Sequence, residues 1–240
     1  RMARLSQEEI ENLLNEKGFK IIDISQYKNL KSDILIECEK GHKIQTNLET
    51  FRKSSFYCPS CLGNDTNNIQ DTIPEKQEGV YRIIALDQAS HKIGLSIYDD
   101  GKLVYYNLIE VIGDFEIRVC KIFKMLNETI IPFWKPDFLS FEDIQLQNDN
   151  VSTFKMLSMV LGVCELAATL HGIPHTETLN TVWQQKFNIK GGRRNQQKRE
   201  VMHKVKEIYG IDVTDDVADA ILLGNFTADK LKDKWFKSDF

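Results

Sequence analysis

The sequence predicts an α/β protein, in which a mixed sheet is flanked by helices and preceded by a small α+β module. Two patterns predict the larger part: strand-like runs at 81–87, 93–99 and 102–109, and then an alternation of helix-like and strand-like segments. Such an order is typical of a mixed sheet covered by helices. A third pattern, cysteines grouped near the N-terminus, indicates that the small module folds around a metal.

The first 60 residues contain the elements of the small module. Ser6 and Glu9 form a capping box that starts a helix, and Gly18 is a plausible stop. Beyond it, the pattern predicts short strands at 19–24 and 34–38 and one short helix at 47–54.

After residue 80 the pattern is that of a larger sheet. Asp100-Gly101 lies between the second and third strand-like runs and is a strong signal for a two-residue hairpin. Apolar spacing predicts the elements that follow: helices at 114–128, 151–171, 195–209 and 214–226, and strands at 138–143 and 174–179.

Composition gives limits on function. The 240 residues are 42% apolar and 28% charged, with a net charge of −4, so overall charge does not indicate nucleic-acid binding and local charge must be read instead. We expect no membrane span and no secretion signal, because we see no apolar run of about 20 residues and no hydrophobic N-terminal region. Five cysteines, three of them close to a histidine, indicate metal binding in a cytoplasmic or other reducing compartment.

Four carboxylates are placed to meet at one end of the larger sheet. Asp87 and Glu142 each end a strand-like run, and Asp216 and Asp219 share one face of an apolar helix. Buried acids are costly without a positive partner, and a cage of oxygens suits Mg²⁺ or Mn²⁺. Two such ions can support an in-line phosphoryl displacement. We expect Asp143 to point to the opposite face from Glu142.

Two alternatives remain open for these acids. Asp215 can take the place of Asp216, although we assign Asp215 to the N-cap and Asp216 to the site. Each acid taken singly can also serve as a cap, a rim charge or a partner of the helix dipole.

The order of these acids resembles the RuvC family of Holliday-junction resolvases, which have the RNase H-like fold. The resemblance covers about residues 80 to 226 and includes the turn Asp-Asp-Val-Ala-Asp-Ala at 215–220. It implies that Asp87, Glu142, Asp216 and Asp219 hold two metal ions and cut DNA. Resolvase-like proteins of phages and organelles are the more similar ones, because plain RuvC proteins lack the N-terminal extension.

A basic segment precedes the acidic helix. Between 186 and 206 only Glu200 is acidic, and Gly191-Gly192 allows close approach to a phosphate. We expect this segment to bind the DNA backbone, although a solvated helix face is the alternative. The candidate contacts are Lys186, Lys190, Arg193, Arg194, Lys198 and Arg199, of which Lys186 and Lys198 best match the family.

The N-terminal cysteines predict a structural zinc site. Cys38 and His42 form one half, and the Cys-x-x-Cys pair Cys58 and Cys61 forms the other. Three thiolates and one imidazole make a closed tetrahedral Zn²⁺ site, and the arrangement resembles zinc-ribbon or treble-clef modules. The alternatives are a different fourth ligand in place of His42, and unpaired thiols.

These patterns divide the chain into four parts: a zinc-binding module at 1–64, a linker at 65–79, an RNase H-like nuclease domain at 80–230 and a C-terminal tail at 231–240. The predicted function is Mg²⁺-dependent cleavage of branched DNA by a homodimer, in recombination and repair. The alternatives are a nuclease acting on flaps, displaced strands or RNA–DNA hybrids, and a non-catalytic nucleic-acid-binding protein. A zinc-dependent hydrolase is excluded by the closed ligand set.

Overall fold

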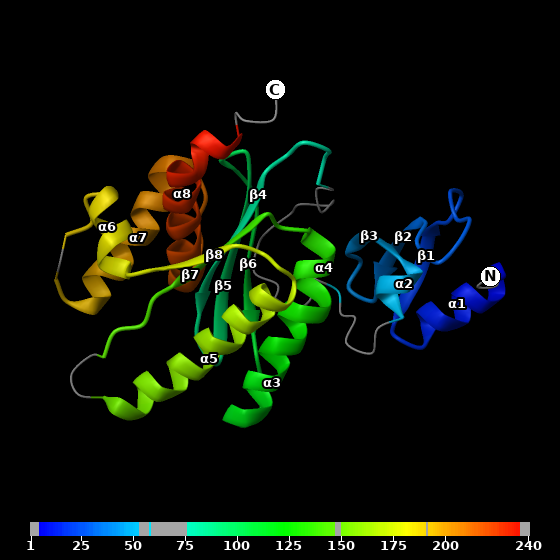
Figure 1. Cartoon of the computed structure of the whole chain (residues 1–240), viewed down its shortest axis with the longest axis horizontal. Coiled ribbons are helices and arrows are strands. Elements are labelled where there is room, and N and C mark those ends of the chain that lie inside the picture. Colours follow the sequence, from blue (N-terminus) through cyan, green and yellow to red (C-terminus); the bar gives the residue numbers. More distant parts are fainter. Residues whose placement is uncertain (1–4, 53–57, 59–75, 147–149, 191, 236–240) are drawn as a thin grey trace.

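Two sheets form the framework of the protein (Figure 1). The computed structural model describes residues 5–52, 58, 76–146, 150–190 and 192–235. The smaller sheet has the antiparallel order β1-β2-β3, and the larger has the order β6-β5-β4-β7-β8.

The small sheet and its helices form around their own apolar cluster, in which Ile10, Ile36 and Phe51 are fully buried. The capping box of Ser6 and Glu9 is present, which confirms the predicted helix start. One strand, β3, was not predicted, because its sequence Lys-Ile-Gln-Thr-Asn is short and mostly polar. The elements are α1 (Gln7–Asn15), β1 (Phe19–Asp23), β2 (Asp33–Cys38), β3 (Lys43–Asn47) and α2 (Leu48–Phe51).

The larger sheet begins as the predicted meander and ends in parallel strands. Asp100 and Gly101 have φ values of 46° and 77°, which confirms the tight hairpin between β5 and β6. β4 pairs in parallel with β7, and β7 pairs in parallel with β8. The strands are β4 (Arg82–Gln88), β5 (Lys92–Asp99), β6 (Lys102–Glu110), β7 (Phe138–Glu142) and β8 (His175–Thr178).

Helices cover both faces of this sheet (Figure 1). One face packs against α3 and α5, and the other packs against α6, α7 and α8. The helices are α3 (Phe115–Met125), α4 (Ile131–Trp134), α5 (Val151–Leu170), α6 (Asn180–Lys186), α7 (Arg194–Tyr209) and α8 (Asp215–Trp235), with a π-helical turn, η1 (Leu126–Ile130), between α3 and α4. This mixed sheet between helices confirms the predicted α/β class.

Two helix boundaries differ from the prediction, and one helix was not predicted. The helix predicted at 114–128 continues through the π-helical turn and α4 to Trp134. Helix α6 was not predicted, because its seven residues are too few for a clear apolar period. Helix α8 runs to Trp235 and so enters the segment that we assigned to a tail, because its apolar spacing continues past residue 226.

The alternation of side chains along β4 separates two environments. Ile84 and Leu86 point into the cluster beneath α3 and α5, whereas Ala85 belongs to the cluster beneath α8. Asp87 has the parity of Ala85, so its carboxylate lies on the α8 face. The sheet therefore delivers this acid to the side where α8 begins.

Candidate active site

Glu142 lies beside Asp87 because their strands are neighbours in parallel register. Leu86 pairs with Phe141, and the next residue of each strand is an acid-bearing position. The Gln88 side chain fixes this end of the sheet: its Nε2 donates to the Glu142 carbonyl oxygen at 2.5 Å, and its Oε1 accepts from the Glu142 N–H at 3.2 Å. The sequence reasoning did not single out Gln88, because a glutamine at a strand end is an ordinary polar residue.

The start of α8 approaches the sheet at a glycine. Gly94 of β5 pairs with Asp87 of β4. A Cβ atom at Gly94 would lie 1.9 Å from the backbone oxygen of Asp216. Two further polar contacts hold the helix close: Ser96 Oγ donates to the Ala220 carbonyl at 2.7 Å, and Tyr98 OH donates to the Ile221 carbonyl at 2.8 Å. The close approach brings the acidic first turns of α8 to the carboxyl end of β4.

The four predicted acids lie in one cluster of carboxylates, in which negative charges and burial raise the pKa of each. Burial, and then the charges of Asp216 and Asp215, raise the pKa of Asp87 to about 7. Burial and the Asp87 charge raise the pKa of Asp219 well above its usual range, and burial with Asp87 and Asp219 does the same for Glu142. The half-buried Asp216 also has a raised pKa, from burial and from Asp215.

Positive charge at this cluster comes from α7. Lys198 forms an ion pair with Asp215, the first residue of α8. Burial acts to raise the pKa of Asp215, but the hydrogen bond and charge of Lys198 outweigh it and lower that pKa. Arg194 and Lys198 also favour the charged form of Asp87. Asp215 therefore has a partner of its own, one position past the N-cap that we expected for it.

The donor set fits hard divalent cations. Four carboxylates supply oxygen ligands in the manner that Mg²⁺ and Mn²⁺ prefer, and their raised pKa values mark buried negative charge that a cation would stabilise. Among the described residues, no three of these four acids bring their oxygens within 4.8 Å of one another, so they are not gathered around one point.

A buried indole borders the cluster. Trp183 is fully buried, and its Nε1 has no hydrogen-bond partner of normal geometry. It still lies near the Glu142 carboxyl, where it acts to lower a pKa that burial and neighbouring acids raise. Trp183 is thus a buried anchor and not an exposed stacking platform. It adds a neutral donor at the edge of the acidic site.

Two of the six predicted DNA contacts are engaged within the protein. Lys186 pairs with Asp229 and donates to Asn225 Oδ1 at 3.2 Å, and Lys198 pairs with Asp215. These two were the best match to the family, but the sequence could not show their acidic partners, which lie 43 and 17 positions away. The side chains of Lys190, Arg193, Arg194 and Arg199 are exposed.

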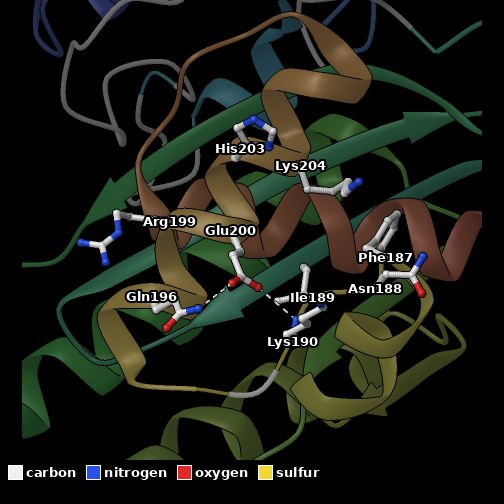
Figure 2. A pocket seen from close by; sticks show the side chains of 9 residues that line it. All are labelled: Phe187, Asn188, Ile189, Lys190, Gln196, Arg199, Glu200, His203 and Lys204. Carbon is white, nitrogen blue, oxygen red and sulfur yellow. Dashed lines mark hydrogen bonds between the residues drawn. The ribbon is translucent and has the colours of Figure 1, made fainter.

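A pocket of about 530 Å³ lies between the end of α6 and the outer face of α7 (Figure 2). Glu200 lies at its centre, where it accepts from the Lys190 backbone N–H at 3.0 Å and from Gln196 Nε2 at 3.1 Å. Lys190, Arg199 and Lys204 line it with positive charge, and Phe187 and Ile189 give it an apolar wall. The pocket therefore belongs to the basic segment and is separate from the four acids.

Three of the four predicted zinc ligands, Cys38, His42 and Cys58, lie together in the small module. His42 Nδ1 lies 3.5 Å from Cys38 Sγ and 3.7 Å from Cys58 Sγ. A tight turn between β2 and β3, with Gly41 at φ 83°, brings Cys38 and His42 together. Cys61 lies outside the described residues, so its predicted role stays a prediction.

Known proteins give the following comparison. No protein-family model matches the sequence, and no curated protein matches it. Among solved structures, the chain is similar to Thermus thermophilus RuvC in complex with a Holliday junction substrate, with 17% identity, a TM-score of 0.49, and coverage of 60% of this chain and 90% of that chain. It is also similar to a second Thermus thermophilus RuvC structure, with 19% identity, a TM-score of 0.47, and coverage of 60% and 91%. For Ydc2, the yeast mitochondrial Holliday junction resolvase, the identity is 14%, the TM-score 0.43, and the coverage 65% and 82%. At these identities the similarity concerns the fold alone.

Proposed function

We propose that the protein is a structure-selective DNA endonuclease that hydrolyses phosphodiester bonds in branched DNA, as a Holliday junction resolvase does. The observation that carries this proposal is the group of four partly buried acids at the carboxyl ends of β4 and β7 and at the start of α8. Their order along the chain is the one that resembles the RuvC family.

The acids have two roles in this proposal. Asp87 and Asp219 hold the ion on the side of the nucleophile, and Glu142 and Asp216 complete the ligand sets. When bound, the two divalent ions supply activation of a water molecule and stabilisation of the leaving oxygen. Gln88 and Trp183 orient Glu142, and Gly94 allows α8 to reach the sheet.

The exposed cations of α7 are the proposed contacts to the DNA backbone. Arg194 is the best placed, because it is exposed at the start of α7 and its charge also acts on Asp87. Lys190, Arg193 and Arg199 extend the positive surface away from the acids. Lys198 acts instead within the site, where it balances Asp215.

We also propose that the small module holds a structural Zn²⁺. The sulfur atoms of Cys38 and Cys58 and a ring nitrogen of His42 lie within 4.8 Å of one another, and they are the soft and borderline ligands that zinc prefers. A module of this size gains much of its stability from the metal.

A homodimer is the proposed assembly, because two coordinated cuts need two active sites. Helix α5 presents an apolar surface that supports this assembly, with Met159 54% and Leu170 62% exposed.

Helix α5 is also long and apolar enough, by length and composition only, to cross a membrane. Its mean hydropathy is 1.5 and 22% of that stretch is buried, so our expectation that no apolar run has this length is wrong. A partner helix that covers this surface would account for its composition.

The test is a cleavage assay with labelled DNA. Purified full-length protein with Mg²⁺ is given a four-way junction, a flap, an RNA–DNA hybrid and a linear duplex of matched sequence. We expect cleavage of the junction in preference to all others, and none when Ca²⁺ replaces Mg²⁺. Preferred cleavage of the flap or hybrid would favour the other nuclease function, and binding without any cleavage would reject catalysis.

A further inference from the structure

A second group of metal-ligating side chains lies outside the site described above. Glu165 of α5 and His175 and Glu177 of β8 bring one ligand atom each within 4.8 Å of one another. We call these three residues the edge cluster, because β8 is the last strand of the larger sheet. Two regular elements supply the ligands, so the backbone holds their positions.

The edge cluster is on the opposite face of the sheet from the four acids. His175 pairs with Leu139 and Glu177 pairs with Phe141, and both partners point into the core beneath α3 and α5. Glu142, by contrast, pairs with Thr178. Since directly paired residues share a face, the edge cluster and the Glu142 carboxylate lie on different sides.

The His175 ring is oriented as a metal ligand. Its Nδ1 lies 3.3 Å from the Ile173 carbonyl oxygen. Because a carbonyl oxygen can only accept, this contact favours the tautomer that carries its proton on Nδ1 and leaves Nε2 as the metal-binding nitrogen. The ring also packs against Phe141, with the centroids 5.9 Å apart. A second hydrogen bond that fixes the tautomer is the usual companion of a metal-bound histidine.

Among the described residues, His175 is the cationic group that acts on Glu165. Within the part of the chain that the structure describes, neither Glu165 nor Glu177 forms an ion pair with a lysine or arginine. Burial, and then the hydrogen bond and charge of Glu177, raise the pKa of Glu165, and Asp143 adds to this effect. Two carboxylates that approach each other without a cation are unfavourable unless a proton or a metal ion lies between them.

We propose that the edge cluster binds a divalent transition-metal ion, of which Zn²⁺ is the best fit. One imidazole nitrogen and two carboxylate oxygens are ligands that Zn²⁺ accepts, whereas Mg²⁺ prefers oxygens alone. The ion joins α5 to the edge strand β8. It therefore stabilises the side of the sheet on which the proposed dimer helix rests.

Zinc counting tests this proposal on the full-length protein. The protein is equilibrated with buffered Zn²⁺ in millimolar Mg²⁺, which competes for the four acids, and bound zinc is measured per chain by elemental analysis. We expect Glu177→Gln and His175→Ala to bind one zinc fewer than the unchanged protein, with at least about a 10-fold weaker affinity at this site. Glu177 is exposed at a sheet edge, so Glu177→Gln will keep the fold.

Two controls make the count specific. His171→Ala removes a nearby histidine that bonds Asn127 instead, and it should leave the zinc count unchanged. Cys58→Ser should remove a different zinc, so that its loss adds to that of Glu177→Gln. A zinc count that is equal in Glu177→Gln, His175→Ala and the unchanged protein would overturn the proposal, as would an equal loss in His171→Ala.

Discussion

At the scale of single residues, the adjacent acids Glu142 and Asp143 point to opposite faces of the sheet. Glu142 is partly buried on the α8 face beside Asp87, whereas Asp143 follows it with the opposite parity and donates its N–H to the Thr178 carbonyl at 3.0 Å. One step along the strand thus separates a proposed metal ligand from an acid outside the site. This pair supplies a matched control for every test of the acids.

Replacement of Asp216 by asparagine should abolish cleavage and leave DNA binding intact. The amide keeps the shape of the side chain but removes a charged ligand, so we expect the cleavage rate to fall at least about 100-fold. Single-turnover cleavage and a binding titration in Ca²⁺ measure the two effects. The control Asp143→Asn should cut at nearly the unchanged rate, and equal loss in both variants would refute the assignment.

The raised pKa of Asp87 predicts a pH-dependent stability in the absence of divalent cations. Unfolded chains lose this proton near the usual pKa of aspartic acid, whereas the folded protein keeps it up to about pH 7. Unfolding is therefore favoured as the pH rises through this window, and the free energy of unfolding decreases. Relative to Asp87→Asn, the unchanged protein should lose on the order of 4 kcal/mol between pH 4 and pH 7. Urea unfolding at several pH values measures this difference, and a constant difference would contradict it.

At the scale of elements, the position of α8 depends on small residues of β5. Gly94 faces the backbone of Asp216, and Ser96 bonds the helix at Ala220. The contact is backbone against backbone, so no side-chain rotation can relieve an added methyl group.

Gly94→Ala should therefore displace the start of α8. We expect a loss of about 1–3 kcal/mol in unfolding free energy and a weaker affinity for Mn²⁺ at the four acids. Ser96→Ala is the comparison, because it removes one hydrogen bond, at about 1 kcal/mol, without pushing the helix away. Equal Mn²⁺ affinities in both variants would show that Gly94 does not set the helix position.

Much of this arrangement could be predicted from sequence, because it depends on local patterns. Turn and capping chemistry predict the hairpin at Asp100-Gly101 and the capping box at Ser6. The run of apolar residues predicts the strand that carries Asp87. The partners of Lys186 and Lys198 could not, because Asp229 and Asp215 meet them only through the packing of α6 and α7 on α8. Gln88 and Gly94 were missed for the same reason, since their roles depend on contacts with β7 and α8.

The small module and the larger sheet have separate apolar clusters in the described part of the chain, and Phe133 contacts one of each. Phe133 of α4 packs against the core of the small module and against the core beneath α3 and α5. Apolar side chains are also exposed to solvent on α5, where Met159, Leu166 and Leu170 lie. A second copy of the chain is the partner that we propose for this face.

Leu166→Glu should convert the dimer into a monomer. Leu166 is 48% exposed on α5, and a buried charge at a homodimer contact would be repeated in both copies. We expect the dimer dissociation constant to rise at least about 100-fold. Sedimentation equilibrium measures it, with Ile112→Glu as a control at a residue outside α5 that is 78% exposed. An unchanged constant in Leu166→Glu, or a monomeric parent protein, would exclude this interface.

The most direct test is the location of Mn²⁺ in crystals of the full-length protein. Anomalous diffraction at the manganese edge should reveal two ions among Asp87, Glu142, Asp216 and Asp219, about 4 Å apart. Crystals of Asp219→Asn should lose at least one of them. Absence of manganese from these four acids, in crystals that bind it elsewhere, would contradict the proposed two-metal nuclease site.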